Sequence, residues 1–337
     1  MLRSLPYVVA NGVPLKNART EDIKFSPKGA LLAAVATNGS MFVFAVDTRS
    51  CPIRIMGCTE LRSSSLSSPH GIDFLSEDTV VVADRSGWVN FYRIPGVNAW
   101  EECMNIEPIH EMGSVWFGRK GATRLLGDRN IRCGPGSVRV HDQQIFICCN
   151  NLNTVTVHDC RLQQGAVETS EGTVVMQVGV EVPDGVALSR DGRWMAVSDH
   201  HHHRVIVHRR PGDAEPCVLR DIDLSYPHGL CFDPTGRVLY VADAGQRYVH
   251  IFVGASGWDK SIDRSTFKLL AVDADAFERT RKAKSGPNSA LEGGIKGIDV
   301  DPSGRILATT CRNQTLRFFE AESELVPTDR LLAAAAI

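Results

Sequence analysis

Two histidines and two carboxylates occupy the same place in a motif that recurs along the chain. His70 and His228 each stand in a Pro-His-Gly triplet, Asp184 stands in Pro-Asp-Gly, and Glu21 takes the equivalent place in the first copy. Imidazoles and carboxylates bind Zn²⁺, Ca²⁺ or Mn²⁺, and they also serve as general acids and bases. If the fold brings these four side chains together, they could form a metal site or an acid–base pair.

The repeat around these residues predicts how they are positioned. Six copies each contain an apolar run, a turn, a β-branched run, a second turn and a third run, and a fourth apolar run usually follows. Four-stranded units of about 45 to 65 residues are typical of β-propellers. We predict an all-β fold, a six-bladed β-propeller with four-stranded antiparallel blades around a central channel. Residues 1–337 would form this single domain, with blades starting near residues 21, 70, 136, 184, 228 and 296.

Two connections between blades are longer than the rest, at residues 95–133 and 254–293. Long loops on a compact scaffold often carry binding groups, although plain surface decoration is equally common. The second connection contains "DAFERTRKAK" at 275–284, where a short surface helix is expected. Either "PYVVANG" near the start or "ESELVPTDRLLA" near the end could supply the strand that closes the ring.

The first strand of a propeller blade lies against the channel, so the residue just before it faces the channel mouth. With six blades, Glu21 would face Asp184, and His70 would face His228. We predict that these four bind one divalent ion, Zn²⁺, Ca²⁺ or Mn²⁺, or that they supply an acid and a base. Lys296 would offset the carboxylates or bind an anionic substrate. Solvated polar side chains without a role are the alternative. The full ring is Glu21, His70, Gly136, Asp184, His228 and Lys296.

The turn between the second and third strands returns to the same mouth and predicts a second ring. Its aspartates are expected to cap their own turns by accepting backbone N–H bonds. Cys149 and Cys311 could place thiols near the mouth, with inert buried cysteine as the alternative. The ring is Thr37, Asp84, Cys149, Asp199, Asp243 and Cys311.

Four histidines, residues 200–203, follow Asp199 in the turn of the fourth copy. His200 or His201 could turn inward as a further ligand or substrate contact, or the run could bind transition metals at the surface without a role. Arg85 follows Asp84 in the second copy, so an anionic group in the mouth would find a partner there.

The composition excludes several classes of partner. The formal net charge is -2 and no long basic run is present, so no nucleic-acid partner is expected. No stretch approaches the roughly 20 apolar residues that span a membrane. The ten cysteines are scattered, without CxxC spacing or an export signal. Reduced thiols and a cytoplasmic location are therefore expected.

The six copies resemble NHL-repeat propellers, whose units read Pro-x-Gly, apolar strand, "VAD" turn, apolar strand. They also resemble the superfamily of gluconolactonase-like, senescence-marker and strictosidine-synthase-like propellers and the peptidyl-amidating lyase domain. The resemblance to gluconolactonases implies a divalent ion held by Glu21 in "RTEDIKF" and Asp184 in "VPDGVAL". The expected asparagine ligands are not matched. The resemblance to the lyase implies zinc held by inner-mouth histidines, which His70 and His228 match in Pro-His-Gly.

The residues and the resemblance together favour a metal-assisted enzyme for a small-molecule substrate, a lactonase-like hydrolase or a lyase. Lys296, Arg85 and Asp184 are the candidate catalytic residues. A carboxylate that does not bind the metal, such as Asp184, would act as the base. Lys296 or Arg85 would stabilise an anionic intermediate. The alternative is a non-catalytic propeller that binds a protein or a small ligand. A weaker hypothesis is a metal-binding or sensing protein centred on residues 200–203.

Overall fold

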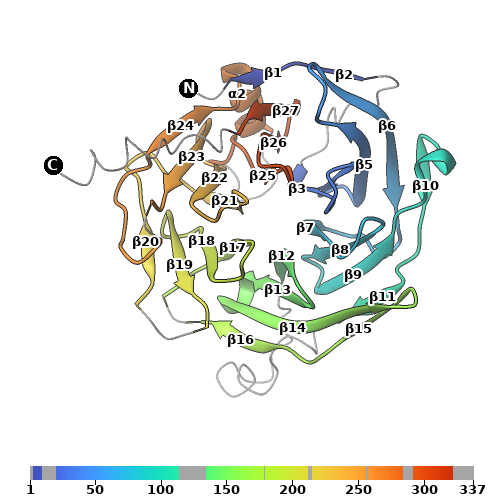
Figure 1. Cartoon of the computed structure of the whole chain (residues 1–337), viewed down its shortest axis with the longest axis horizontal. Helices are drawn as coiled ribbons and strands as arrows, with labels where there is room; N and C mark the ends of the chain where they lie inside the picture. The colour runs from blue at the N-terminus through green and yellow to red at the C-terminus, as the bar shows by residue number, and fades with distance from the viewer. Residues whose placement is uncertain are drawn as a thin grey trace.

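The computed structural model is a six-bladed β-propeller, with its first strands grouped around a central axis (Figure 1). It describes residues 3–9, 20–113, 134–177, 179–211, 215–255, 257–283 and 291–321. The innermost strand of every blade starts next to the motif position identified in the sequence. These strands are β3 (Thr20–Phe25), β7 (Pro69–Phe74), β12 (Pro135–His141), β17 (Pro183–Leu188), β21 (Pro227–Phe232) and β25 (Gly297–Val300).

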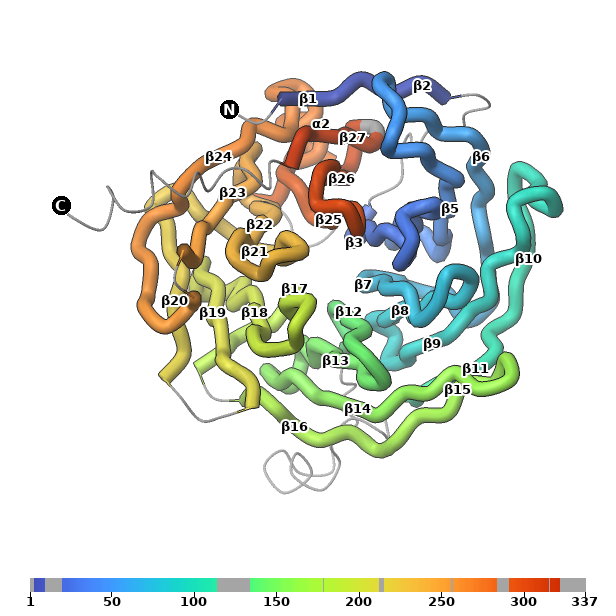
Figure 2. Tube along the Cα trace, viewed as in Figure 1, coloured from blue at the N-terminus to red at the C-terminus, as the bar shows by residue number. Residues whose placement is uncertain are grey.

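The second and third strands of each blade continue outward in antiparallel order (Figure 2). The second strands are β4 (Leu31–Ala36), β8 (Thr79–Asp84), β13 (Gln144–Cys149), β18 (Trp194–Asp199), β22 (Val238–Asp243) and β26 (Ile306–Cys311). The third strands are β5 (Ser40–Asp47), β9 (Trp88–Arg93), β14 (Thr154–Gln163), β19 (Arg204–Arg209), β23 (Tyr248–Val253) and β27 (Gln314–Glu320).

The outer strands vary more than the inner ones. In blades one to five they are β6 (Ile53–Arg62), β11 (His110–Met112), β15 (Ala166–Thr169) with β16 (Thr173–Met176), β20 (Cys217–Leu219) and β24 (Phe267–Leu270). The long connections contain β11 and β24, so they complete blades two and five as well as linking blades. Residues 114–133 and 284–290 of these connections lie outside the described residues.

The N-terminal segment closes the ring. β1 (Ser4–Leu5) pairs antiparallel with β27 and forms the outer strand of blade six. β2 (Tyr7–Val9) pairs in parallel with β6 of blade one, so the described strand within "PYVVANG" joins the first blade, and Ser4 and Leu5 close the last. β10 (Cys103–Asn105) also pairs in parallel with β6. The competing segment 322–333 lies outside the described residues.

Helical structure is scarce in the described part of the chain. The expected surface helix is confirmed as α2 (Ala274–Lys282), and short 3₁₀ turns form at η1 (Val97–Ala99) and η3 (Asn150–Leu152). α2 buries Ala276 and Phe277 against the cluster of blades five and six. Within the described residues, no helix has both the length and the apolar character needed to cross a membrane.

The hydrophobic core is divided into wedges between neighbouring blades. One wedge joins Val35 and Met41 of blade one to Ile72 and Val80 of blade two, and similar clusters follow at the other blade boundaries. The apolar residues alternate along each strand because successive side chains point to opposite faces of the blade. Each blade therefore packs through both faces, and the channel lining is left to polar side chains.

A register irregularity at the start of the first strand sets which side chains reach the channel. The pairing of first and second strands shifts between Pro69 and Gly71, between Pro183 and Val186, and at equivalent places in blades one, three and five. In a regular strand, positions three residues apart point to opposite faces, but a bulge changes that alternation. Residues three positions apart along these strands form two successive polar layers in the channel.

The second charged layer consists of Asp22, Lys24, Asp73, Arg139 and Asp299. Three of these carboxylates join adjacent blades by accepting a backbone N–H from the next one. Asp22 accepts from Ile72, Asp73 from Val140 and Asp299 from Phe25, with N···O distances of 3.3, 2.7 and 2.9 Å. The layer therefore links blades six, one, two and three around the axis.

The glycine of the repeated triplet allows neighbouring blades to approach closely. A Cβ atom on Gly185 would lie 2.0 Å from the backbone oxygen of His228, and one on Gly229 would lie 2.4 Å from that of Lys296. Both distances are far below van der Waals contact. The triplet therefore recurs with glycine because each first strand lies against the backbone of the next.

We expect Gly185→Ala to lower the free energy of unfolding by about 1–3 kcal/mol, the usual effect of overpacking a site that cannot expand. Urea unfolding followed by fluorescence measures this change. Gly96→Ala is the matched control, since its Cβ would meet nothing within 4 Å. Equal stability of the two variants would contradict the role assigned to the close approach.

Candidate metal centre in the channel

The ionisable positions of the predicted inner ring meet at one end of the channel. Glu21 lies on β3, His70 on β7, Asp184 on β17 and His228 on β21, while Lys296 directly precedes β25. All five side chains are buried. We call these five residues the channel cluster. They come from five different blades, so only the closed ring brings them together.

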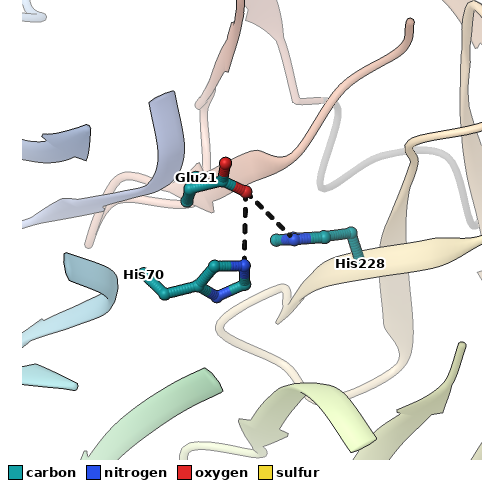
Figure 3. A group of neighbouring side chains, drawn as sticks. All are labelled: Glu21, His70 and His228. Atoms are coloured by element: carbon teal, nitrogen blue, oxygen red, sulfur yellow. Dashed lines mark ion pairs between the residues drawn. The ribbon is translucent and has the colours of Figure 1, made fainter. Parts of the chain in front are cut away.

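Glu21 lies between the two histidines (Figure 3). Its Oε2 atom is 3.2 Å from His70 Nε2 and 3.5 Å from His228 Nε2. The two imidazole rings are themselves close, with 4.9 Å between their centroids. One donor atom from each of the three residues lies within 4.8 Å of the others, so the group could hold a metal ion.

Hydrogen bonds to backbone carbonyls fix the orientation of both imidazoles. His70 Nδ1 donates to the backbone oxygen of Gly136, and His228 Nδ1 donates to that of Lys296 at 3.2 Å. A carbonyl can only accept, so each neutral ring carries its proton on Nδ1 and a lone pair on Nε2. Those lone pairs face the Glu21 carboxylate, which also carries only lone pairs. A cation bound by these three acceptors would remove the repulsion between their lone pairs. Histidine ligands of metals are commonly oriented by a hydrogen bond from the other ring nitrogen, as both are here.

Asp184 lies against the other side of the two imidazoles. Its Oδ2 is 3.3 Å from His228 Nε2, and its Oδ1 is 3.9 Å from His70 Nε2. Two donors hold the carboxylate in place, since Arg85 Nη2 is 2.8 Å and Asn150 Nδ2 is 2.6 Å from Oδ1. Asp184 can therefore act as a fourth ligand or remain beside the metal as a base.

A second chain of contacts leads from Glu21 towards the channel mouth. Lys296 Nζ lies 2.9 Å from Glu21 Oε2 and 2.8 Å from Glu292 Oε2. His200 Nε2 lies 3.4 Å from Glu292 Oε1, and its Nδ1 is 3.6 Å from Asp184 Oδ2. Glu292 thus shares the charge of Lys296 with Glu21, and His200, outside the cluster, contacts both Glu292 and Asp184.

The carboxylates of the cluster remain ionised despite their burial. Burial raises the pKa of Glu21, but the Lys296 ammonium makes the largest opposing contribution and the pKa lies well below its usual value. Burial likewise raises the pKa of Asp184, but His228 and Arg85 hold it well below its usual value. The site therefore presents anionic oxygen ligands at neutral pH.

The two histidines for which a shift is resolved differ in charge state. Burial lowers the pKa of His228 to about 4, despite the opposing effect of Asp184. His228 is therefore neutral at pH 7, the form that binds metals. Burial also lowers the pKa of His200, but Glu292 and Asp184 outweigh it and raise the pKa above its usual value. A neutral imidazole, His228, thus lies inside the site and a more basic one, His200, lies at its edge.

The cavity next to the channel cluster is very small. Side chains of the channel cluster and of the second charged layer enclose a cavity of about 10 Å³. A volume of this size is about one probe sphere, enough for one water molecule or one ion. A substrate would have to approach from the mouth side, where Arg85 and His200 lie.

Comparisons with known proteins identify the architecture. No protein-family model matches the sequence, and no curated protein matches it significantly. Among solved structures, the chain is similar to that of a luciferin-regenerating enzyme, with a TM-score of 0.56 and 13% sequence identity. The alignment covers 91% of this chain and 93% of the other. What the two share is the fold.

Three of the additional candidates lie away from the channel cluster. His201 is exposed and faces Glu181, with 4.0 Å between Nε2 and Oε1. Cys149 is fully buried in the wedge between blades two and three, and Cys311 is buried in the wedge between blades five and six. Burial raises the pKa of Cys311 to about 12, so its thiol stays protonated. The structure offers no contact between these three residues and the cluster.

The aspartates of the predicted second ring cap turns, as the sequence indicated. Asp84 accepts backbone N–H bonds from Ser67, Ser68 and Ser86, and Asp243 accepts from Ser225 and Gly245. In blades two and five, these bonds tie the second turn to the segment that precedes the first strand. The ring therefore supports the backbone that presents the channel cluster.

Two residues of the site escaped the sequence analysis. Asn150 begins the 3₁₀ turn η3 and takes the place that arginine holds in blade two. Glu292 lies in the irregular segment before β25, four residues before Lys296. The spacing of Glu292 and Lys296 gave no usable signal, because the pairing rule for positions i and i+4 holds in helices and this segment is not helical. For Asn150, the signal was its alignment: it follows Cys149 in the third copy as Arg85 follows Asp84 in the second.

Proposed function

We propose that this protein is a metal-assisted enzyme that acts on a small molecule at one mouth of the propeller channel, as a lactonase-like hydrolase or a lyase. The observation that carries the proposal is the convergence of His70 Nε2 and His228 Nε2 on Glu21 Oε2, with both Nδ1 atoms anchored to the backbone. Zn²⁺, Ca²⁺ and Mn²⁺ are the candidate ions. That a luciferin-regenerating enzyme shares the fold supports an enzymatic role.

The charges around the site support a reaction that passes through an anionic intermediate. Three carboxylates, Glu21, Asp184 and Glu292, lie with two cations, Lys296 and Arg85. With neutral imidazoles the set carries one net negative charge, and a divalent ion would make it positive by one. An anionic substrate or a developing oxyanion would restore neutrality. A bound ion polarises a carbonyl and lowers the pKa of water, which is what ring opening of a lactone requires.

The protein side chains divide the remaining tasks. Glu21, His70 and His228 would hold the ion, with Asp184 as ligand or base. Arg85 keeps Asp184 ionised and is itself about two-fifths exposed, so its remaining N–H groups can bind an anionic group of the substrate. Lys296, held between Glu21 and Glu292, would stabilise the negative charge of an intermediate.

The nine described cysteines are free thiols, which supports the cytoplasm as the compartment of this protein.

A non-catalytic propeller is the second candidate function. The observation that favours it is the size of the cavity at the cluster, about 10 Å³, which leaves room for an ion but not for a substrate. In this alternative, the ion would stabilise the ring, and the mouth would bind a small ligand or a protein.

The test is elemental analysis of untagged protein, purified without a metal-affinity step, followed by turnover measurements on a panel of lactones and esters. We expect about one divalent ion per chain. Hydrolysis should be lost after chelation and regained on adding back Zn²⁺, Ca²⁺ or Mn²⁺. One ion per chain without turnover on any substrate would favour the non-catalytic function. A chain that binds none of the three ions would rule out the metal-assisted enzyme.

A further inference from the structure

A second cavity lies at the opposite mouth of the channel. The first strands start at the channel cluster and end at this mouth, where they line a cavity of about 320 Å³. We call it the far vestibule. Its walls include Phe25, Phe74, Leu188 and Phe232, which come from four different blades. The far vestibule is large enough for a small organic molecule, unlike the cavity at the channel cluster.

The floor of the far vestibule is the second charged layer. Asp73, Arg139 and Asp299 all border the cavity. Arg139 lies between the two carboxylates but contacts them only loosely, with Nε 3.6 Å from Asp73 Oδ2 and Nη2 3.5 Å from Asp299 Oδ1. Each carboxylate is fixed instead by an N–H of the next blade and keeps further lone pairs for another donor.

The second charged layer is short of positive charge. It contains the carboxylates of Asp22, Asp73 and Asp299 but only two cations, Lys24 and Arg139. Lys24 already pairs with Asp22, because its Nζ donates to Asp22 Oδ1 and to the backbone oxygen of Ile298, both at 2.9 Å. Burial raises the pKa of Asp73, and Arg139 offsets only part of that effect. A further cation near Asp73 and Asp299 would balance the layer.

We propose that the far vestibule binds a small organic monocation, with its ammonium or amidinium group at Asp73 and Asp299 and an apolar body against the phenylalanine walls. Phe25, Phe74 and Phe232 border the same cavity as the two carboxylates, and aromatic rings attract cations. The lining also includes Asp233, Asp301 and Arg190, so together with Asp73, Asp299 and Arg139 it carries four carboxylates and two guanidinium groups. The apolar side chains beside these charges favour an organic cation over an inorganic ion, which gains nothing from apolar contacts. The site is independent of the channel cluster and of any reaction there.

Benzylamine, benzyl alcohol and benzoate are matched probes, because they share the ring and differ in charge. Isothermal titration of the chelator-treated full-length protein at low salt should show binding of benzylamine, with a Kd on the order of 1 mM, normal for so small a ligand. Benzyl alcohol and benzoate should bind at least tenfold more weakly. Chelator treatment removes metal from the channel cluster, so the amine cannot bind there as a ligand.

Two variants locate the site. Asp299→Asn should weaken benzylamine binding at least tenfold by removing a floor charge. Leu188→Trp should abolish binding by filling the cavity without touching a charge, and it covers the case in which Asp299→Asn fails to fold. His70→Ala should bind benzylamine as well as the wild type. Preference for benzoate, equal binding of the three probes, displacement of the amine by millimolar Ca²⁺, or undiminished binding to Leu188→Trp would each overturn the proposal.

Discussion

Replacing His70 by alanine is expected to remove the metal ion from the channel. Loss of a hydrogen-bond partner behind a ligand lowers metal affinity by about 10- to 100-fold, so loss of the ligand itself should exceed about 100-fold. Turnover on any substrate identified should fall by at least as much. Competition with a chromophoric chelator measures the affinity, and steady-state kinetics measures kcat/KM.

Two further variants separate ligation from packing. His70→Asn keeps an N–H group that can reach the Gly136 carbonyl but has no counterpart of Nε2, so it should lose the metal as His70→Ala does. A His201→Ala/His202→Ala double variant should keep the metal, because both side chains are substantially exposed and face Glu181. Metal retained by His70→Asn, or lost from the double variant, would refute the assignment of His70 as a ligand. The second result would move the metal to the histidine-rich turn.

Removal of the Lys24 ammonium is expected to destabilise the whole ring. In Lys24→Met, the carboxylate of Asp22 and the backbone oxygen of Ile298 would lose a donor that each holds at 2.9 Å. Removing one partner of a buried ion pair typically lowers stability by about 3–5 kcal/mol, since the other charge stays buried and uncompensated. Equilibrium unfolding in urea gives this difference directly.

A second substitution should recover part of that loss. Asn at position 22 removes the stranded charge and keeps an oxygen for the Ile72 N–H, which Asp22 now accepts at 3.3 Å. We therefore expect Asp22→Asn/Lys24→Met to be more stable than Lys24→Met alone, and the double-mutant cycle to show a coupling of more than about 1 kcal/mol. Additive effects of the two substitutions would show that the pair does not act as a unit.

The inner ring could be predicted from the sequence because the repeat marks where each first strand begins. Pro-x-Gly has a backbone role, so its middle residue is aligned from blade to blade, and in blades two, four and five that residue is His70, Asp184 and His228. Glu21 followed from the same alignment despite the absence of proline and glycine beside it. The strand that closes the ring was identified only to within a few residues, because a two-residue strand leaves almost no pattern.

The second charged layer could not be predicted in the same way. Four of its residues, Lys24, Asp73, Arg139 and Asp299, lie three positions beyond the inner ring, where regular alternation would point them to the opposite face of the blade, and Asp22 lies one position beyond it. The register shifts lie in the pairing of the first and second strands of single blades, and the contacts of Asp73 and Asp299 are made to a backbone N–H of the next blade. Neither feature leaves a pattern in the sequence. Asn150 and Glu292 were missed for a related reason, since each is positioned by an irregular turn and not by a repeating strand.

The closure of blade six has a consequence for the order in which the protein can mature. A ribosome makes Ser4 long before Phe319, and these two residues pair in the finished ring. Glu21 and Lys296, whose charges meet in the channel, are almost as far apart in time. A nascent chain therefore cannot assemble the channel cluster until the residues of blade six have been made. Binding of a metal there would be a late step, and a chain truncated within its last blade would leave the candidate ligands without the ring that brings them together.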